Sequence, residues 1–226
     1  MYNIESYIAE CINSCINQQG VDPEDYEIII VNDGSTDRSL DIAQELIKSV
    51  PNACIITRPN GGLSAARNTG MDNANGDYLW FVDGDDAISP EASKVLITNI
   101  NKTNCDAYLI NFSTYDGTNK IATSNFTGFN EPISGEEYHF KYNRILPMMA
   151  WQTIYKAEVL RRNSIYFLPD IIHEDLEFSI RAHHISPTIE FIKVDLYLYR
   201  ISRSGSIMNE VKKDITKSLK SLIAID

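Results

Sequence analysis

Apolar residues in this chain first recur at helical spacing and then gather into short continuous runs. A helical pattern covers residues 5–18 and is followed by the break QQGVDPEDY. Three apolar runs, YEIIIV, ACIIT and YLWFV, are typical of strands buried on both faces, and helical patterns separate them. The runs lie at 26–31, 53–57 and 78–82. We therefore expect an α/β fold with a mostly parallel sheet, in which these strands are parallel and helices flank both faces.

The second half of the chain has a weaker pattern. After about residue 110 the alternation fades into polar and aromatic sequence, and regular patterns return at MMAWQTIYKAEVLRRN and HEDLEFSIRAHHI. The stretch LEFSIRAHH predicts a short, partly buried helix. We interpret residues 1–110 and 111–226 as two halves of one domain, the second of which sets specificity.

Composition and charge exclude several classes of function. The chain has 226 residues and a net charge of −11, which would repel nucleic acid and anionic membranes. Four cysteines without a C-x-x-C spacing indicate reduced thiols. No apolar run approaches the roughly 18 residues of a membrane span, and the start lacks a signal-peptide pattern. We expect a cytoplasmic protein. The C-terminal segment has an amphipathic pattern, which is compatible with association with the inner face of the membrane.

Acidic turns follow two of the predicted strands. Asn32-Asp33-Gly34 comes after the first run, and Asp83-Gly84-Asp85-Asp86 comes after the third. Because the carboxyl ends of parallel strands meet at one edge, we expect both turns on one rim. There Asp33 could bind a base or ribose, although Asn-Asp-Gly is also an ordinary turn.

The aspartates at 83–86 have two interpretations. They could form a solvated turn before a capped helix, but Ser89-Pro90-Glu91 already supplies the helix-start signals. A site for a diphosphate with Mg²⁺ or Mn²⁺ is the better interpretation, because carboxylates suit these ions. The G-x-x-x-x-G-K-[ST] and G-x-G-x-x-G motifs are absent from the sequence, which argues against a P-loop NTPase or a Rossmann dehydrogenase.

Six segments together resemble the family 2 inverting glycosyltransferases of the GT-A fold, in order and spacing over residues 2 to about 207. They are YNIESYIAECINSCINQ, YEIIIVNDGSTDRS, RPNGGLSAARNTGM, GDYLWFVDGDD, MAWQTIYKAEVL and HEDLEF. The resemblance implies metal-assisted transfer of a sugar, with inversion, from a nucleotide diphosphate donor to an acceptor hydroxyl. The donor would usually be a UDP-sugar, and the acceptor a glycan or another hydroxyl compound.

The same resemblance implies roles for individual residues. Asp33 would hold the base and ribose, Asp83 and Asp85 the donor and metal, and Asp175, with Glu174 beside it, would be the catalytic base. By themselves Glu174 and Asp175 could equally be capping acids at a helix start. Trp151 would lie near the acceptor. The implied donor site comprises Tyr2, Asn3, Glu5, Asp33, Asn60, Gly62, Arg67, Asp83, Gly84, Arg200 and Arg203, the two late arginines belonging to a loop that can close over the diphosphate.

One departure from the family concerns the start of the chain. Family members begin with an apolar strand ending in a Pro-x-Tyr-Asn turn, and here only Tyr2-Asn3 follows Met1. We expect either a trimmed or misassigned start, or a sheet without its first strand, whose neighbouring strand edges are uncovered.

Two alternatives to a glycosyltransferase are compatible with the sequence. One is a nucleotide-sugar-binding module or inactive partner subunit with the same fold. The other is a phospho-receiver domain, which also places aspartates and Mg²⁺ at strand ends, but such domains are much shorter and would not need the HEDLEF half.

Overall fold

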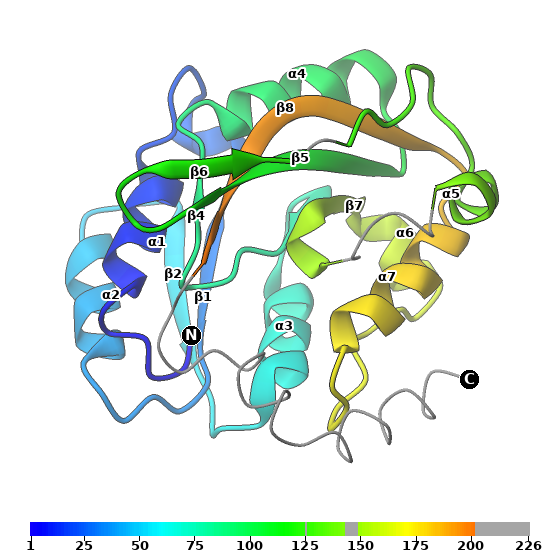
Figure 1. Cartoon of the computed structure of the whole chain (residues 1–226). Helices are drawn as coiled ribbons and strands as arrows, with labels where there is room; N and C mark the ends of the chain where they lie inside the picture. Colours follow the sequence, from blue (N-terminus) through cyan, green and yellow to red (C-terminus); the bar gives the residue numbers. More distant parts are fainter. Residues whose placement is uncertain (125, 143–148, 202–226) are drawn as a thin grey trace.

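The computed structural model describes residues 1–124, 126–142 and 149–201 (Figure 1). The helices are α1 (Ile8–Ile16), η1 (Pro23–Asp25), α2 (Ser39–Ile47), α3 (Gly62–Asn73), α4 (Ala92–Thr103), α5 (Gly135–Lys141), η2 (Ala150–Gln152), α6 (Ala157–Arg162) and α7 (Glu174–His184). The strands are β1 (Ile28–Asn32), β2 (Ala53–Thr57), β3 (Tyr78–Trp80), β4 (Ala87–Ile88), β5 (Ala107–Tyr115), β6 (Lys120–Thr123), β7 (Thr153–Lys156) and β8 (Ile189–Arg200).

The described strands form two sheets rather than one. β1 and β2 pair in parallel, as expected. The second sheet has the order β3-β7-β5-β8-β4, with β6 on β5, and its β5 and β8 are parallel while its other pairs are antiparallel. β3 pairs with β7, so the three predicted strands are not joined by hydrogen bonds into one sheet. The α/β class with flanking helices is confirmed, but the second sheet is mixed.

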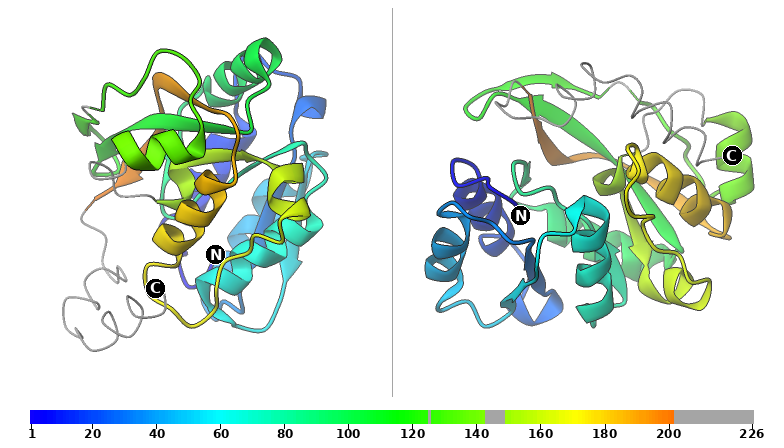
Figure 2. Two further views of the ribbon diagram at one scale, coloured as in Figure 1. Left: turned by 90° about the vertical axis from the view of Figure 1, so that its right-hand side faces the viewer. Right: turned by 90° about the horizontal axis from the view of Figure 1, so that it is seen from below.

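Helix α3 occupies a central place between the two parts of the molecule. Figures 1 and 2 show it beside β1 and β2, with α1 and α2 on one side and α7 on the other. The predicted helices near 5–18 and 40–47 are present as α1 and α2, whose apolar faces meet β1 around Ile8, Ile12 and Ile30. This placement lets α3 contact residues from both halves of the chain.

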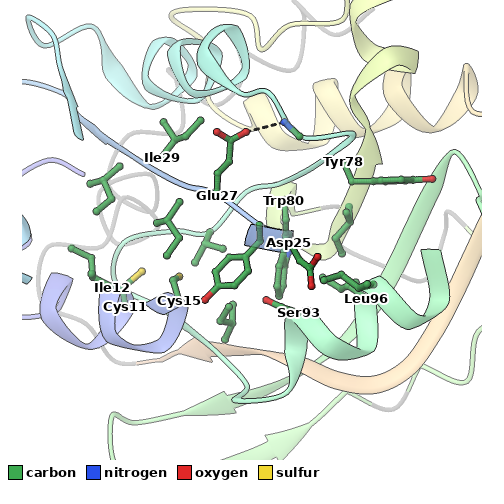
Figure 3. A pocket seen from close by; sticks show the side chains of 18 of the residues that line it. Cys11, Ile12, Cys15, Asp25, Glu27, Ile29, Tyr78, Trp80, Ser93 and Leu96 are labelled. Atoms are coloured by element: carbon green, nitrogen blue, oxygen red, sulfur yellow. Dashed lines mark hydrogen bonds between the residues drawn. The ribbon is translucent and has the colours of Figure 1, made fainter. Parts of the chain in front are cut away.

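An apolar cavity of about 610 Å³ separates β1 from β3 (Figure 3). Side chains of α1 and α4, among them Ile12, Cys15 and Leu96, line it together with both strands. Within the described residues, β1 has a strand partner only in β2, and β3 only in β7. The uncovered strand edges that we expected are therefore present, and both face this cavity.

Residue 1 already lies against the uncovered edge of β1. The amino group of Met1 donates to the Val31 carbonyl, and the Asp33 N–H donates to the Met1 carbonyl at 3.0 Å. This alternation is that of a parallel ladder. An extended segment joined in front of Met1 would thus run along β1 into the cavity.

The cysteines and the length of the helices bear on two predictions from the sequence. The four cysteines, all within the described residues, are free thiols, as predicted. Among the helices that the structure describes, none has the length and apolar character needed to cross a bilayer.

We predict that an apolar strand added in front of Met1 stabilises the protein. An extension matching β1's five residues, such as Val-Ile-Val-Ile-Val, would bury side chains worth about 1.5–3 kcal/mol each, against about 1–2 kcal/mol per residue of backbone ordering. The free energy of unfolding in urea should rise by a few kcal/mol. A Ser/Asn extension of equal length is the control, and equal stability of the two variants would contradict the prediction.

Candidate active site

The turn after β1 is built around two buried polar side chains. Asn32 Oδ1 accepts from the Ser35 N–H at 3.1 Å, which closes the turn, and Gly34 has a φ of +73° that favours glycine. Asp33 is only 3% exposed, and its carboxylate accepts from the N–H groups of Gly61 and Gly62, the latter at 2.8 Å. Asp33 thus binds the N-terminus of α3, where a negative charge is favoured by the helix dipole.

Further contacts around Asp33 come from the segment before α3. The Arg58 guanidinium donates to Asp33 Oδ1 at 3.1 Å, and Asn60 Nδ2 donates to the Asp33 carbonyl at 3.0 Å. Gly62 has a φ of +85°, so the Gly-Gly pair allows the bend that brings these N–H groups to the carboxylate. Asp33, Asn60 and Gly62 are therefore together, as predicted, and Arg58 is a partner that the sequence analysis missed.

The N-terminal residues fasten the same turn from outside. Asn3 Oδ1 accepts from the Thr36 N–H at 2.8 Å, and Glu5 Oε2 accepts from the Arg38 N–H at 2.9 Å. Tyr2 is 50% exposed. The predicted edge of the nucleotide pocket thus has two side chains that order the turn and one ring that faces solvent.

Arg67 links the two acidic segments of the predicted site. Its guanidinium lies 2.9 Å from Asp83 Oδ1 and 2.9 Å from Glu174 Oε1, and it stacks over the Phe167 ring at 5.1 Å. Its side chain is only 8% exposed. Because Arg67 lies five residues after Gly62, a distance of about 7–8 Å along the helix, α3 contacts both Asp33 and Asp83. Residues of both turns therefore contact one helix.

Asp175 has an altered acidity in this cluster. Burial and the neighbouring charge of Glu174 raise its pKa to about 6, and the positive charge of Arg67 opposes the shift. Its Oδ1 accepts from the Leu176 N–H at 2.9 Å at the start of α7. A carboxylate with this pKa is ionised at neutral pH and can still accept a proton, which suits a general base.

Gly84 and Asp86 shape the turn between the predicted metal ligands. A Cβ at Gly84 would lie 2.5 Å from Ile4 Cδ1, so no side chain fits there without rearrangement. Asp86 is 1% exposed, and burial together with the charges of Asp83 and Asp85 raises its pKa to about 8. The side chain of Asp86 is thus buried, whereas those of Asp83 and Asp85 are partly exposed.

Three late predictions have different outcomes. Arg200 reaches the acidic turn, but as the buried end of β8 rather than in a loop, because its Nε donates to the Asp85 carbonyl at 2.8 Å. Trp151 is 2% exposed and stacks on Tyr197 with ring centroids 4.1 Å apart, so it occupies the core rather than a surface open to an acceptor. Arg203 lies outside the described residues.

The donor chemistry of the turn at 83–85 fits Mg²⁺ or Mn²⁺. Asp83 Oδ1 accepts from Arg67, and Asp83 Oδ2 with the Asp85 carboxylate would be the ligands. Over the described ranges, His, Cys, Asp and Glu side chains form no cluster of three suited to a metal. Mg²⁺ is commonly held by one or two carboxylates plus substrate phosphates and waters, so a site of two carboxylates is sufficient.

Comparisons with known proteins agree with this geometry. Residues 1–163 match the family model described as glycosyl transferase family 2. The chain is 32% identical over 219 residues to EpsH of Bacillus subtilis (strain 168), a protein named as a glycosyltransferase, with 94% of this chain and 62% of EpsH covered. It is also 32% identical over 212 residues to the poly(ribitol-phosphate) beta-glucosyltransferase of Bacillus spizizenii, with 92% and 32% covered.

A solved structure shows the same fold. The crystal structure of Staphylococcus aureus TarS 1–349 in complex with UDP-GlcNAc superposes with a TM-score of 0.84 at 25% identity, over 100% of this chain and 63% of that one. The chain thus spans 62% of EpsH, 63% of TarS 1–349 and a smaller share of the glucosyltransferase.

We predict that Arg67→Met destabilises the protein by about 2–3 kcal/mol, because it leaves the carboxylates of Asp83 and Glu174 without their buried partner. Water reaches part of the Asp83 side chain, which limits the loss. It should also raise the pKa of Asp175 above about 6, since Arg67 lowers it. Urea unfolding and an NMR titration measure the two effects. Arg67→Lys, which keeps the charge, should show smaller ones; a methionine variant of unchanged stability and unchanged Asp175 pKa would refute the role of Arg67.

Proposed function

The chain belongs to glycosyl transferase family 2, and we propose that it transfers a sugar from a nucleotide diphosphate donor to an acceptor hydroxyl with inversion of the anomeric carbon. The observation that carries this proposal is the double ion pair of Arg67. It brings Asp83, in the turn suited to a diphosphate, next to Glu174 and Asp175 at the start of α7. A donor-binding group and a candidate base thus adjoin one another.

We propose a UDP-sugar as the donor. TarS, whose fold this chain shares, has been crystallised with UDP-GlcNAc. In the present chain, Asp33, Asn60 and Gly62 are joined by hydrogen bonds at the end where the base and ribose would bind, and Arg67 supplies positive charge toward the diphosphate. Because the Asp33 carboxylate already binds Arg58 and α3, nucleotide recognition at this end would use the exposed Tyr2 and the backbone beside Asp33 as well.

Asp83 and Asp85 would hold Mn²⁺ or Mg²⁺, which when bound neutralises the diphosphate and improves it as a leaving group. Arg67 orients the Asp83 carboxylate through its 2.9 Å ion pair. Asp175 removes the proton from the acceptor hydroxyl as that oxygen attacks the anomeric carbon from the face opposite the leaving group. One displacement of this kind inverts the anomer, and the proton ends on an Asp175 oxygen.

We assign the two halves of the domain different substrates. Residues 1–110 would bind the nucleotide sugar, and residues 111–226 would supply the base and the acceptor surface. As the acceptor we propose a hydroxyl of a cell-envelope glycan or polyol polymer, modified on the cytoplasmic side. This proposal is based on the similarity of the chain to a poly(ribitol-phosphate) glucosyltransferase.

A non-catalytic donor-binding module is the second candidate. The uncovered edges of β1 and β3 favour it, because they lie next to the turn that carries Asp33 and so leave one wall of the nucleotide end unsupported. Hydrolysis or transfer of a UDP-sugar separates the candidates, since a binding module shows affinity for the donor without turnover.

We predict that Mn²⁺ strengthens UDP binding and that Asp85→Asn removes most of this gain, because an amide is a weaker ligand and carries no charge. Isothermal titration of UDP with and without Mn²⁺ measures it. Asp22→Asn is the control, because it removes an exposed carboxylate at the start of η1, which precedes the end of β1 opposite to the turn of Asp33. A wild-type affinity that ignores Mn²⁺ would refute the metal role and leave the fold untouched.

We predict that Asp175→Asn lowers kcat by about 10²–10⁴-fold with little change in donor affinity, because asparagine keeps the shape but cannot accept the proton. In the wild type, kcat/KM should fall about tenfold per pH unit below the Asp175 pKa of about 6, as the base becomes protonated. Glu177→Gln, in the same first turn of α7, is the matched control and should retain activity. Wild-type turnover by Asp175→Asn would make Asp175 structural and Glu174 the next candidate for the base.

A further inference from the structure

The hydroxyl of Tyr197, on β8, joins two aspartates of the acidic turn from inside the protein. It donates to Asp86 Oδ2 at 2.7 Å and accepts from the Asp83 N–H at 3.1 Å. Because a phenol has a single proton, donation to Asp86 leaves the oxygen lone pairs for Asp83, and the two bonds are compatible. The turn is closed independently by the Asp86 N–H, which donates to the Asp83 carbonyl at 3.0 Å.

Packing fixes the position of this hydroxyl. Tyr197 is completely buried, and its ring lies parallel to that of Trp151, with centroids 4.1 Å apart and an interplanar angle of 1°. Asp86 is 1% exposed, and its second oxygen, Oδ1, accepts from the Arg200 N–H at 2.8 Å. Both oxygens of Asp86 are therefore occupied by β8, so this aspartate cannot serve a metal or a substrate without breaking these bonds.

Arg200 holds the next residue of the turn. Its Nε donates to the Asp85 carbonyl at 2.8 Å, while its Nη2 donates to the Tyr115 hydroxyl at 2.7 Å and pairs with Glu10. The guanidinium also lies over the rings of Tyr115 and Tyr7, 4.5 Å and 5.2 Å from their centroids. β8 therefore anchors the backbone at both Asp83 and Asp85.

We propose that Asp86 and Tyr197 are positioning residues, which fix the backbone of the turn so that the carboxylates of Asp83 and Asp85 face the metal-bound diphosphate. This inference rests on the proposed function for the role of those carboxylates. In these bonds the carboxylate of Asp86 is held inside the protein, whereas Asp83 and Asp85 are held through their backbone groups. The arrangement also explains why Trp151 is deeply buried, since its ring holds Tyr197 in place.

The test uses Tyr197→Phe, which removes the hydroxyl and keeps the stacked ring. Tyr108→Phe is the matched control, because the buried Tyr108 hydroxyl likewise accepts a backbone N–H, that of Cys105 at 2.8 Å, away from the turn. Amide hydrogen exchange without ligand and UDP titration with and without Mn²⁺ are measured on both variants. The first measurement does not depend on the proposed function.

Tyr197→Phe should accelerate exchange at the Asp83 amide by about three- to tenfold, the loss expected for one hydrogen bond, and should reduce the Mn²⁺-dependent gain in UDP affinity by a similar factor. Tyr108→Phe should change exchange only near Cys105. Should Tyr197→Phe fail to fold by circular dichroism, Asp86→Asn is tested instead, because it weakens the bond from the Tyr197 hydroxyl to Asp86, which orients that hydroxyl toward the Asp83 N–H.

The outcomes separate the inference from the proposed function. Unchanged exchange at the Asp83 amide overturns the positioning role. So does faster exchange combined with an unchanged Mn²⁺-dependent gain. If the wild type shows no Mn²⁺-dependent binding of UDP, the metal part of the proposed function fails, while the exchange measurement still decides whether Tyr197 holds the turn.

Discussion

The candidate site depends on one buried cation, the guanidinium of Arg67. A charged side chain that is only 8% exposed must be paired, and here its partners come from opposite halves of the chain, Asp83 after β3 and Glu174 on α7. The fork geometry of arginine lets one side chain serve two carboxylates, which a lysine ammonium does less well. The position of α7 relative to the acidic turn is therefore coupled to α3.

Helix α3 is fixed at its other end by a second charge. The buried Asp33 carboxylate binds the first N–H groups of the helix, so α3 contacts both the turn of Asp33 and the turn of Asp83. Around the remote end, the carboxylates of Asp83, Asp85, Glu174 and Asp175 outnumber the nearby guanidinium of Arg67. Burial, together with the negative charges of Glu174 and Asp83, raises the pKa of Asp175, and the excess of negative charge favours an added cation at the turn.

Local patterns predicted the elements and motifs, and they failed where strands must choose partners. The spacing of Ile8 and Ile12 indicated α1, and the position of Asp33 after an apolar run indicated a functional turn. Pairing of β3 with β7 could not be foreseen, because antiparallel partners distant in sequence leave no local signal. Trp151 shows the same limit: an aromatic residue near a motif gives no indication whether it stacks in the core, as it does on Tyr197.

We infer that the two acidic segments joined by Arg67 face a single bound donor. A crystal structure of the protein with UDP and Mn²⁺ tests it most directly. We expect the diphosphate and the ion at the turn of Asp83 and Asp85, the nucleotide base near Asp33, and the Asp175 carboxylate facing the position of the transferred sugar. Nucleotide bound elsewhere, or bound at the turn with Asp175 directed away from the diphosphate, would contradict it.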